Sequence, residues 1–288
     1  MTRCWFVDDH RAEHPVKLLC RLVELPRATY YRWAAGRVSD RLLDDAHLAN
    51  EIVEVYRQSR GTYGSPRVWG QLRRGGIRVG QKRVARIMAE LGLVGAHSRK
   101  RWRRGANTAP AGDLLERDFT ATASDLRWVA DITEFRCLDG KLYLAGIVDL
   151  HDRSICGWSM GERQTTDLVV NALVMALARR DPDSELIHHA DKGSQYTAVE
   201  FTNRLADWNL RASYSSTGDC FDNAAMESVW AALKREIRHL HGDWSQLTRS
   251  QLRTILFDYI ETFYNRTRHQ ARLEHRTPAE TYAASRAA

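Results

Sequence analysis

A block of three strand signals joined by tight turns constrains the fold of the second half of this chain. Residues 128–135 alternate between apolar and polar side chains, Asp139-Gly140 supplies a hairpin turn, and residues 141–150 give a second strand signal. Residues 154–160 give a third after a short polar turn. Three consecutive strands predict that this half of the chain is built on a β-sheet.

Helical and strand patterns alternate after this block. The expected elements are a helix at 166–180, a strand at 185–190, a helix at 198–208, a strand at 210–214, and helices at 223–240 and 247–265. This order predicts an α/β fold in which a mixed five-stranded sheet is flanked by helices.

Three carboxylates occupy suggestive places on this map. Asp131 lies within an apolar strand, where a carboxylate costs free energy unless something pairs with it. Asp191 ends the fourth strand and Glu227 lies on the following helix. If the fourth strand pairs beside the first, the two aspartates are neighbours. Carboxylates without His or Cys partners suit Mg²⁺ or Mn²⁺, and two such ions about 4 Å apart can drive phosphodiester chemistry.

Simpler interpretations of the same residues remain open at this point. A strand-terminal aspartate such as Asp191 can be a turn residue, and Glu227 can be a solvated helix residue. Asp149 and Asp222 are rival carboxylates, at the end of the second strand and just before the helix that carries Glu227. Spacing alone does not choose between these possibilities.

The helix that carries Glu227 can be divided into faces. Trp230, Lys234 and Arg238 fall on the same side as Glu227, at i+3, i+7 and i+11. A separate apolar stripe consists of Met226, Val229, Leu233 and Ile237. We therefore expect one stripe to pack and the other to present a carboxylate, an indole and two cations to DNA, with Lys234 on substrate phosphates.

The charge distribution points to nucleic acid. The chain has a formal net charge of +7, but residues 1–112 hold 22 Lys and Arg against 10 Asp and Glu, and all but six of the 43 basic residues are arginine. Arginine's planar fork suits phosphate contacts. A merely soluble surface, or codon usage that favours arginine, is the alternative. Codon usage explains arginine over lysine, but it does not explain the asymmetry between the two halves.

The front half is predicted to be helical. Two short helices within 14–36 fit either a small DNA-binding unit or an ordinary helical hairpin. Helices at 44–58, 67–74 and 81–91 fit a helix-turn-helix module, with Arg83 and Arg86 on the outward side of the last helix. A cationic segment follows, made of Arg99, Lys100, Arg101, Arg103 and Arg104. It is either a solvated linker or a linker that lies along the phosphate backbone of DNA.

Several classes of protein are disfavoured. No apolar run reaches the ~18 residues that a membrane-spanning helix needs, and the N-terminus lacks a secretory h-region. The five cysteines are odd in number and form no Cys-x-x-Cys pair, which argues against a disulfide framework and a zinc finger. We therefore expect a cytoplasmic protein.

The motifs together resemble a known family. The segments concerned are Trp128-x-x-Asp131-Ile132-Thr133, His189-x-Asp191-x-Gly193-Ser194-Gln195-Tyr196, Asp222-Asn223-Ala224, Glu227-Ser228 and Leu233-Lys234-x-Glu236. In order and spacing they resemble the OrfB-type transposases of the insertion-sequence-three family, which belong to the retroviral-integrase superfamily. The segments Tyr259-Ile260-x-x-Phe263-Tyr264-Asn265 and Thr62-Tyr63-Gly64 extend the resemblance over nearly the whole chain.

This resemblance implies a transposase with an RNase H-like catalytic domain. Asp131, Asp191 and Glu227 would bind two Mg²⁺ ions that drive cleavage at insertion-sequence ends and 3′-OH strand transfer into target DNA, without ATP. The implied units are a helical hairpin at 1–40, a helix-turn-helix-like module at 41–96, a basic linker at 97–112, the catalytic core at 113–245 and a helical extension at 246–288. The implied partners are double-stranded DNA, further copies of the chain, and a protein or fusion from an upstream reading frame.

The chain departs from the family pattern beside Asp191. The family usually has Ser and Arg where this chain has Ala190 and Lys192, which spares the carboxylate but changes a residue expected to contact DNA.

Two rival functions remain. A tyrosine-type recombinase would use a set such as His269, Arg272 and Tyr282 without metal. A non-catalytic DNA-binding regulator would need only the basic front half.

Overall fold

The computed structural model describes residues 3–36, 40–97, 120–182, 186–214 and 224–287. The chain divides into two compact units, Met1–Glu54 and Val55–Ala288. Helix α4 (Asp40–Gln58) contains the boundary between them. Each unit has its own core, and the candidate site belongs to the second.

The first unit is a small helical cluster. It contains α1 (Arg3–His10), α2 (Val16–Leu22) and α3 (Arg27–Ala34). Val7, Leu19, Cys20 and Tyr30 are buried between these helices. The hydroxyl of Tyr30 donates a hydrogen bond of 2.9 Å to Asp8. The two helices expected within 14–36 are present, and α1 adds a third that sequence analysis did not predict.

Two helices of the second unit form the rest of the helix-turn-helix-like region. They are α5 (Ser65–Arg74) and α6 (Gln81–Glu90), which bury Val68, Leu72, Val84 and Ile87. Helix α5 begins two residues before the predicted 67–74, with Gly64 as its N-cap. Helix α6 ends one residue before the predicted 81–91, and Leu91 is 44% exposed.

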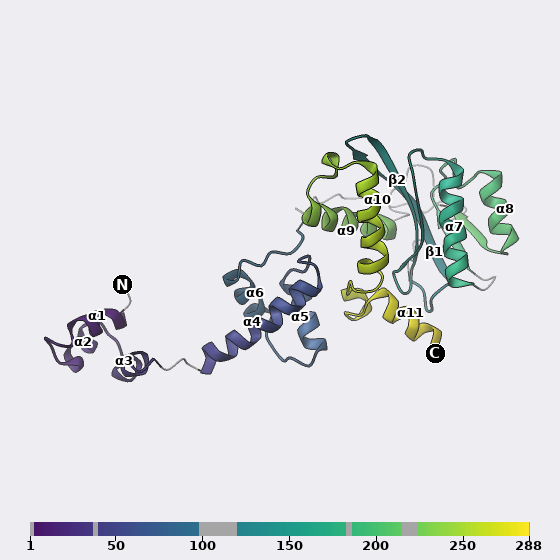
Figure 1. The fold of residues 1–288 in the computed structure, drawn as a ribbon. Coiled ribbons are helices and arrows are strands. Elements are labelled where there is room, and N and C mark those ends of the chain that lie inside the picture. The colour runs from purple at the N-terminus through teal and green to yellow at the C-terminus, as the bar shows by residue number, and fades with distance from the viewer. Residues whose placement is uncertain (1–2, 37–39, 98–119, 183–185, 215–223, 288) are drawn as a thin grey trace, which may run out of the picture. The chain divides into compact units, whose positions relative to one another are not determined.

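A five-stranded mixed sheet forms the centre of the second unit (Figure 1). The strands are β1 (Arg127–Cys137), β2 (Gly140–Asp149), β3 (Ile155–Gly161), β4 (Ile187–Ala190) and β5 (Arg211–Tyr214), in the order β3-β2-β1-β4-β5. β1, β2 and β3 pair antiparallel, whereas β4 is parallel to β1 and β5 is parallel to β4. The predicted fold class is confirmed.

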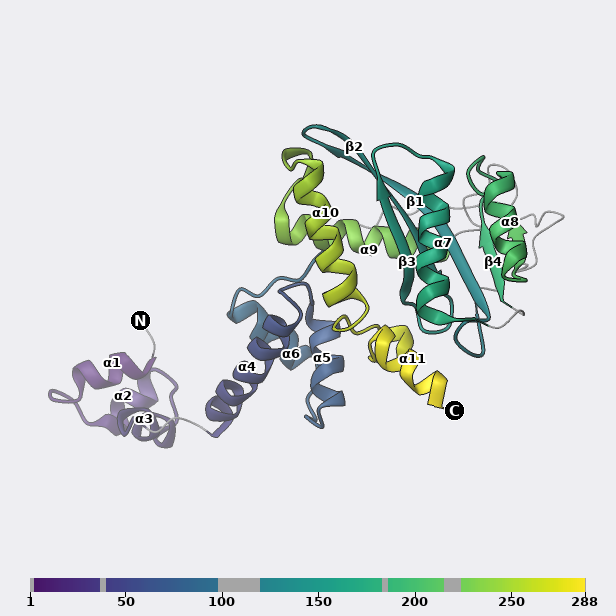
Figure 2. The same cartoon turned by 45° about the vertical axis from the view of Figure 1, so that its right-hand side comes forward.

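Helices α7 (Thr166–Arg180) and α8 (Val199–Asp207) cover one face of the sheet. Figure 2 shows α7 lying along β2 and β3. Alternation along β1 sends Trp128 and Ala130 into this face, where they pack with Leu173 and Phe201 in the main core. Asp131, one residue further along, therefore faces the opposite side.

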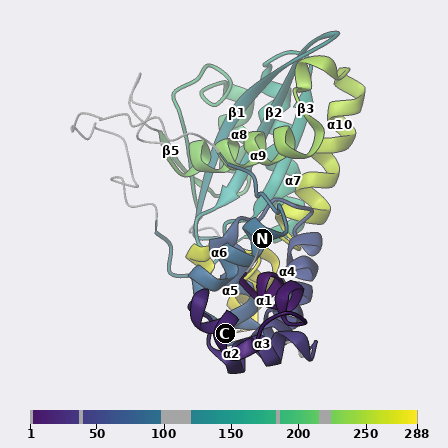
Figure 3. The ribbon, with the colours of Figure 1, turned by 90° about the vertical axis from the view of Figure 1, so that its left-hand side faces the viewer.

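Helix α9 (Ala224–His241) crosses the opposite face, as Figure 3 shows. It is followed by α10 (Arg249–Asp258), a π-helical segment at Tyr259–Tyr264 and α11 (Pro278–Ala287). The predicted packing stripe of α9 is confirmed, because all four of its members are buried.

A buried carboxylate fixes the far half of α9. Glu236 is fully buried, accepts hydrogen bonds of 2.8 Å from Arg268 at both of its oxygens, and accepts one of 2.7 Å from the hydroxyl of Tyr259. Arg67 on α5 lies 3.1 Å from the same carboxylate. This network joins α9, the C-terminal segment and the helix-turn-helix-like region within one unit.

None of the helices in the described ranges combines the length and apolar content that crossing a membrane requires. The cationic linker residues Arg99, Lys100, Arg101, Arg103 and Arg104, and the rival carboxylate Asp222, lie outside the described residues.

Candidate active site

Asp131 sits in the middle of the sheet on the face covered by α9. It is half-buried, and it lies opposite Gly146 of β2 in the antiparallel register. Burial raises the pKa of its carboxyl from the ordinary 3.8 to about 6, and the charges of Asp191 and Glu227 act in the same direction. Asp191 and Glu227 are therefore both close enough to Asp131 to oppose its ionisation.

The register of the parallel pair places Asp191 beside Asp131. Val129 pairs with His189, so continuing both strands by two residues brings Asp131 and Asp191 level. β4 ends at Ala190, which leaves Asp191 exposed at the point where the chain leaves the sheet. The hypothesis that the fourth strand pairs beside the first is confirmed.

A local turn fixes the carboxylate of Asp191. Its Oδ1 accepts a hydrogen bond of 3.1 Å from the backbone N–H of Gly193. A Cβ at residue 193 would lie 2.9 Å from that oxygen, closer than side-chain atoms normally approach. A side chain at residue 193 would therefore require the Asp191 carboxylate to move. Ala190, at the departure from the family pattern, is buried in the core, while Lys192 is exposed.

Glu227 completes the set from the first turn of α9, where it is exposed. The three carboxylates supply the oxygen ligands that hard divalent cations prefer, and a cation would offset the unfavourable effect of Asp191 and Glu227 on the charge of Asp131. Within the part of the chain that the structure describes, no three Asp, Glu, His or Cys side chains converge closely enough to hold an ion. The donor set and the charge therefore fit a metal, without forming a closed coordination sphere.

Trp230 requires a correction. It was expected on the DNA-facing side of α9, but it is only 5% exposed and packs over β2 at Gly146, where a Cβ would lie 2.5 Å from its ring. Its indole Nε1 donates a hydrogen bond of 3.0 Å to Oδ2 of Asp131. The large ring reaches from the Glu227 side of α9 into the interface between α9 and the sheet. Trp230 therefore positions the carboxylate of Asp131. The missed signal was Gly146, since a glycine inside a strand often marks a close approach.

Replacing Trp230 with phenylalanine tests this role. The ring can still fill the space above Gly146, but the hydrogen bond to a charged acceptor, which contributes about 1.5–3 kcal/mol, is lost. We expect DNA cleavage to slow by roughly ten- to a hundredfold and the melting temperature to fall by roughly 3–12 °C, at about 2–4 °C for each kcal/mol lost, while DNA affinity stays near the wild-type value. A large fall in DNA affinity with a wild-type cleavage rate at saturation would restore the DNA-facing interpretation.

The cations of α9 lie at the edge of the site. Burial lowers the pKa of Lys234, and the opposing attraction of Asp131 shows that this half-buried amine is near the carboxylate. Its Nζ lies 5.1 Å from the ring centroid of Phe135. Arg238 is exposed and stacks on Trp244 at 4.2 Å. Arg238 thus lies at the solvent side of the helix that carries Glu227, whereas Lys234 is half-buried against β1.

The two arginines of α6, Arg83 and Arg86, are far from Asp131 in the sequence. Arg86 is exposed and forms an ion pair of 2.8 Å with Glu90 one turn along the helix. Arg83 is half-buried.

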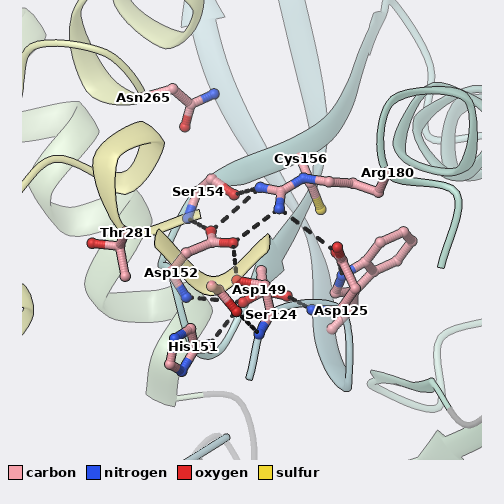
Figure 4. A network of polar contacts seen from close by, with 12 residues as sticks. Ser124, Asp125, Asp149, His151, Asp152, Ser154, Cys156, Arg180, Asn265 and Thr281 are labelled. Atoms are coloured by element: carbon pink, nitrogen blue, oxygen red, sulfur yellow. Dashed lines mark hydrogen bonds and ion pairs between the residues drawn. The ribbon is translucent and has the colours of Figure 1, made fainter. Parts of the chain in front are cut away.

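The rival carboxylate Asp149 is structural. It is fully buried, and its oxygens accept backbone N–H donors from Asp125, His151 and Asp152 at 2.7–2.9 Å. Figure 4 shows these residues around Arg180, which also pairs with Asp152 at 2.9 Å. Burial and the charge of Asp152 raise the pKa of Asp149 to about 7. Its oxygens hold the β2–β3 turn and are not available to a substrate.

Comparison with known proteins agrees with this architecture. The "Integrase core domain" family model matches residues 121–220, and the "HTH-like domain" model matches residues 43–101. The "Insertion element IS600 uncharacterized 31 kDa protein" of Shigella sonnei is 38% identical over 265 residues, covering 91% of this chain and 96% of the relative. "Transposase InsF for insertion sequence IS3A" of Escherichia coli (strain K12) is 37% identical over 273 residues, covering 92% and 93%.

The chain belongs to the insertion-sequence-three family of transposases. It is thus a member of a class of metal-dependent enzymes that cut and join DNA strands. A simian T-cell lymphotropic virus intasome in complex with PP2A regulatory subunit B56 gamma is similar at 16% identity and a TM-score of 0.49, covering 71% of this chain and 67% of that one. A likeness of this size bears on neither site nor mechanism.

Family membership removes the rival functions. The residues of the tyrosine-recombinase alternative also have other contacts. Tyr282 stacks under the guanidinium of Arg180, whose Cζ is 3.5 Å from the ring centroid. His269 packs against Tyr63 and its backbone N–H donates to that hydroxyl.

Proposed function

We propose that Asp131, Asp191 and Glu227 are the catalytic carboxylates of this transposase and hold two Mg²⁺ or Mn²⁺ ions. The observation that carries this proposal is the parallel pairing of β1 with β4, which brings Asp131 and Asp191 level, together with the contact of α9 on Asp131 through Trp230. The three groups are carried by β1, the end of β4 and α9, and the rival Asp149 is engaged by backbone amides. Bound divalent ions would activate the attacking oxygen and stabilise the leaving one.

Each side chain has a distinct part in this scheme. The indole of Trp230 donates a hydrogen bond to the carboxylate of Asp131, and β1 holds its backbone. Asp131 would therefore be the fixed ligand. Asp191 is oriented by its turn through Gly193 and is open to solvent on the other side. Glu227 approaches from α9, and Lys234, two turns further along the same stripe, would hold a substrate phosphate near Asp131.

The reaction proposed is hydrolysis at the ends of the element followed by attack of the freed 3′-OH on target DNA in the bacterial cytoplasm. Arg238 and Lys192 would contact the DNA beside the site. Arg83 and Arg86 would contact it from the helix-turn-helix-like module, where Arg86 is exposed. Joining two ends calls for at least two copies of the chain, and an upstream-frame protein is a further candidate partner.

A strand-transfer assay tests the proposal. Purified protein, labelled duplexes that carry candidate element ends, and a target plasmid are combined with Mg²⁺ or with EDTA. Joined products should form only with the metal. Products that persist in EDTA would overturn the proposal, since transesterification at three carboxylates needs the cations to offset the developing charge.

Neutralising the linker should weaken DNA binding of every sequence. Changing Arg99, Lys100, Arg101, Arg103 and Arg104 to glutamine removes five positive charges. If each of these side chains neutralises one phosphate, the slope of log affinity against log salt falls by about 0.9 for each charge removed. Filter binding over a range of salt on specific and random duplexes measures this. A loss confined to one DNA sequence would contradict the linker role.

A further inference from the structure

A cavity of about 310 Å³ lies along a face of α9 that adjoins the packing stripe at Val229. The other helix residues of its wall, Ser228, Ala231, Ala232 and Arg235, have the spacing of a single helical face. Five arginines line it: Arg67 from α5, Arg153 from the β2–β3 turn, Arg235 from α9, and Arg268 and Arg272 from the segment before α11. Its lining, as far as the structure describes it, contains no acidic residue.

The arginines around this cavity carry more positive charge than the neighbouring carboxylate neutralises. Glu236 lies behind the wall, and its Oε1 is 3.1 Å from Arg67, 2.8 Å from Arg268 and 3.8 Å from Arg235. The single carboxylate of Glu236 thus forms ion pairs with three guanidinium groups. Arg153 and Arg272 form no ion pair with any residue that the structure describes, so the cavity has a strong surplus of positive charge.

Arg153 is the decisive side chain. It is only 5% exposed, it lines the cavity, and among the described residues its guanidinium has no hydrogen-bond acceptor. Burial and the neighbouring charge of Arg272 lower the pKa of Arg153, against the opposing effects of Tyr264 and Asp149. The side-chain nitrogen of Gln270, which also lines the cavity, is buried without a hydrogen-bond partner. A buried donor without an acceptor, as at Gln270, is costly, and an anion in the cavity would satisfy it and would also pair with Arg153.

We propose that this cavity is a phosphate site that holds one backbone phosphodiester of the DNA bound by the transposase. The proposal rests on the proposed function only in taking DNA as the substrate. Arginine forks are the usual donors to phosphate oxygens, and the rim residue Arg272 is exposed, which leaves a path for a backbone phosphate to enter. Ser228 directly follows Glu227, so a strand seated here would run beside the catalytic helix.

The test measures the salt dependence of DNA binding in EDTA, where no cleavage interferes. The double variant Arg235→Gln/Arg272→Gln removes two donors at the more open side of the cavity and leaves the buried Arg268–Glu236 pair intact. If the variant no longer holds that one phosphate, the slope of log affinity against log salt should fall by about 1 on a random-sequence duplex. The matched control Arg136→Gln/Arg276→Gln removes the same charge from exposed positions outside the cavity and should keep the wild-type slope.

Inorganic phosphate provides a second probe of the same chemistry. At constant ionic strength, exchanging chloride for phosphate should raise the melting temperature of the wild-type protein and the control. The shift should vanish in the double variant and in Arg153→Gln, if the latter folds. Equal slopes for the double variant and its control would overturn the proposal. A phosphate-dependent shift with unchanged slopes would also overturn it, because the cavity would then take a free phosphate solute instead of DNA.

This test is separable from the test of the catalytic carboxylates. Asp131→Asn should bind DNA with the wild-type slope, since it lies outside the cavity. If Asp131→Asn cleaves DNA at the wild-type rate, the assignment of the active site fails, and the slopes still decide the cavity.

Discussion

Replacing Asp131 with asparagine is expected to abolish Mg²⁺-dependent cleavage and joining while DNA binding survives. An amide keeps the size of the side chain and can still accept the indole hydrogen bond from Trp230, but it removes the charge that the ions require. Metal ions contribute several kcal/mol to charge stabilisation in the transition state. A loss of about 4 kcal/mol is roughly a thousandfold in rate. Single-turnover cleavage of a labelled end measures it.

The fold should not suffer from this change. Burial and two neighbouring carboxylates oppose ionisation of Asp131 in the folded state, so a neutral side chain should leave the melting temperature equal or slightly higher. Asp207→Asn, at an exposed position on α8, is the matched control and should cleave normally. Asp191→Asn and Glu227→Gln should repeat the loss. Full Mg²⁺-dependent cleavage by any of these three variants would remove that residue from the catalytic set.

Replacing Glu236 with glutamine should cause the largest loss of stability of any single change considered for this chain. It leaves Arg268 buried and without its counter-ion, and breaking a buried pair in this way costs about 3–5 kcal/mol. For a unit of this size, each kcal/mol shifts the melting temperature by roughly 2–4 °C, so a fall of about 10 °C is expected. Calorimetry measures it.

An exposed pair supplies the control for this prediction. Glu90→Gln removes the partner of Arg86 on the surface of α6, where such pairs contribute about 0.3–0.5 kcal/mol. Its melting temperature should stay within about 2 °C of wild type. If both variants fall equally, the buried network is not what holds α9 in place.

The same network predicts how stability depends on pH. Despite the opposing effect of burial, the charges and hydrogen bonds of Arg268, together with Arg67, lower the pKa of Glu236 from the ordinary 4.5 to about 2. Because the folded state holds this proton less tightly than the unfolded state, the stabilisation is complete above pH 4.5. It is lost as the pH falls towards 2. Glu236→Gln should therefore flatten the acid limb of the stability curve between these values, as chemical denaturation at several pH values would show.

Sequence reasoning located the main parts of the site because they follow from short-range rules. Alternation along β1 and parallel pairing with β4 made Asp131 and Asp191 neighbours, and helical periodicity identified the packing stripe of α9. Helical periodicity failed for Trp230, because an angle around a helix does not say how far a large ring extends over an adjacent strand. The cavity could not be predicted, since its arginines, from Arg67 to Arg272, are brought together only by tertiary packing.

Helix α9 carries the carboxylate Glu227, the supporting indole of Trp230, the buried anchor Glu236 and the wall of the phosphate cavity. All of these groups are carried by one continuous helix, so the angles between them are set by the helix itself. One residue inserted after Trp230 would turn everything beyond it by about 100°, and it would misplace Glu236 and Arg235 while leaving Glu227 where it is. Length variation between relatives should therefore be absent from this helix and permitted beyond Gly242, where the chain leaves it. The spacing within α9, more than the identity of its surface residues, sets the geometry of the enzyme.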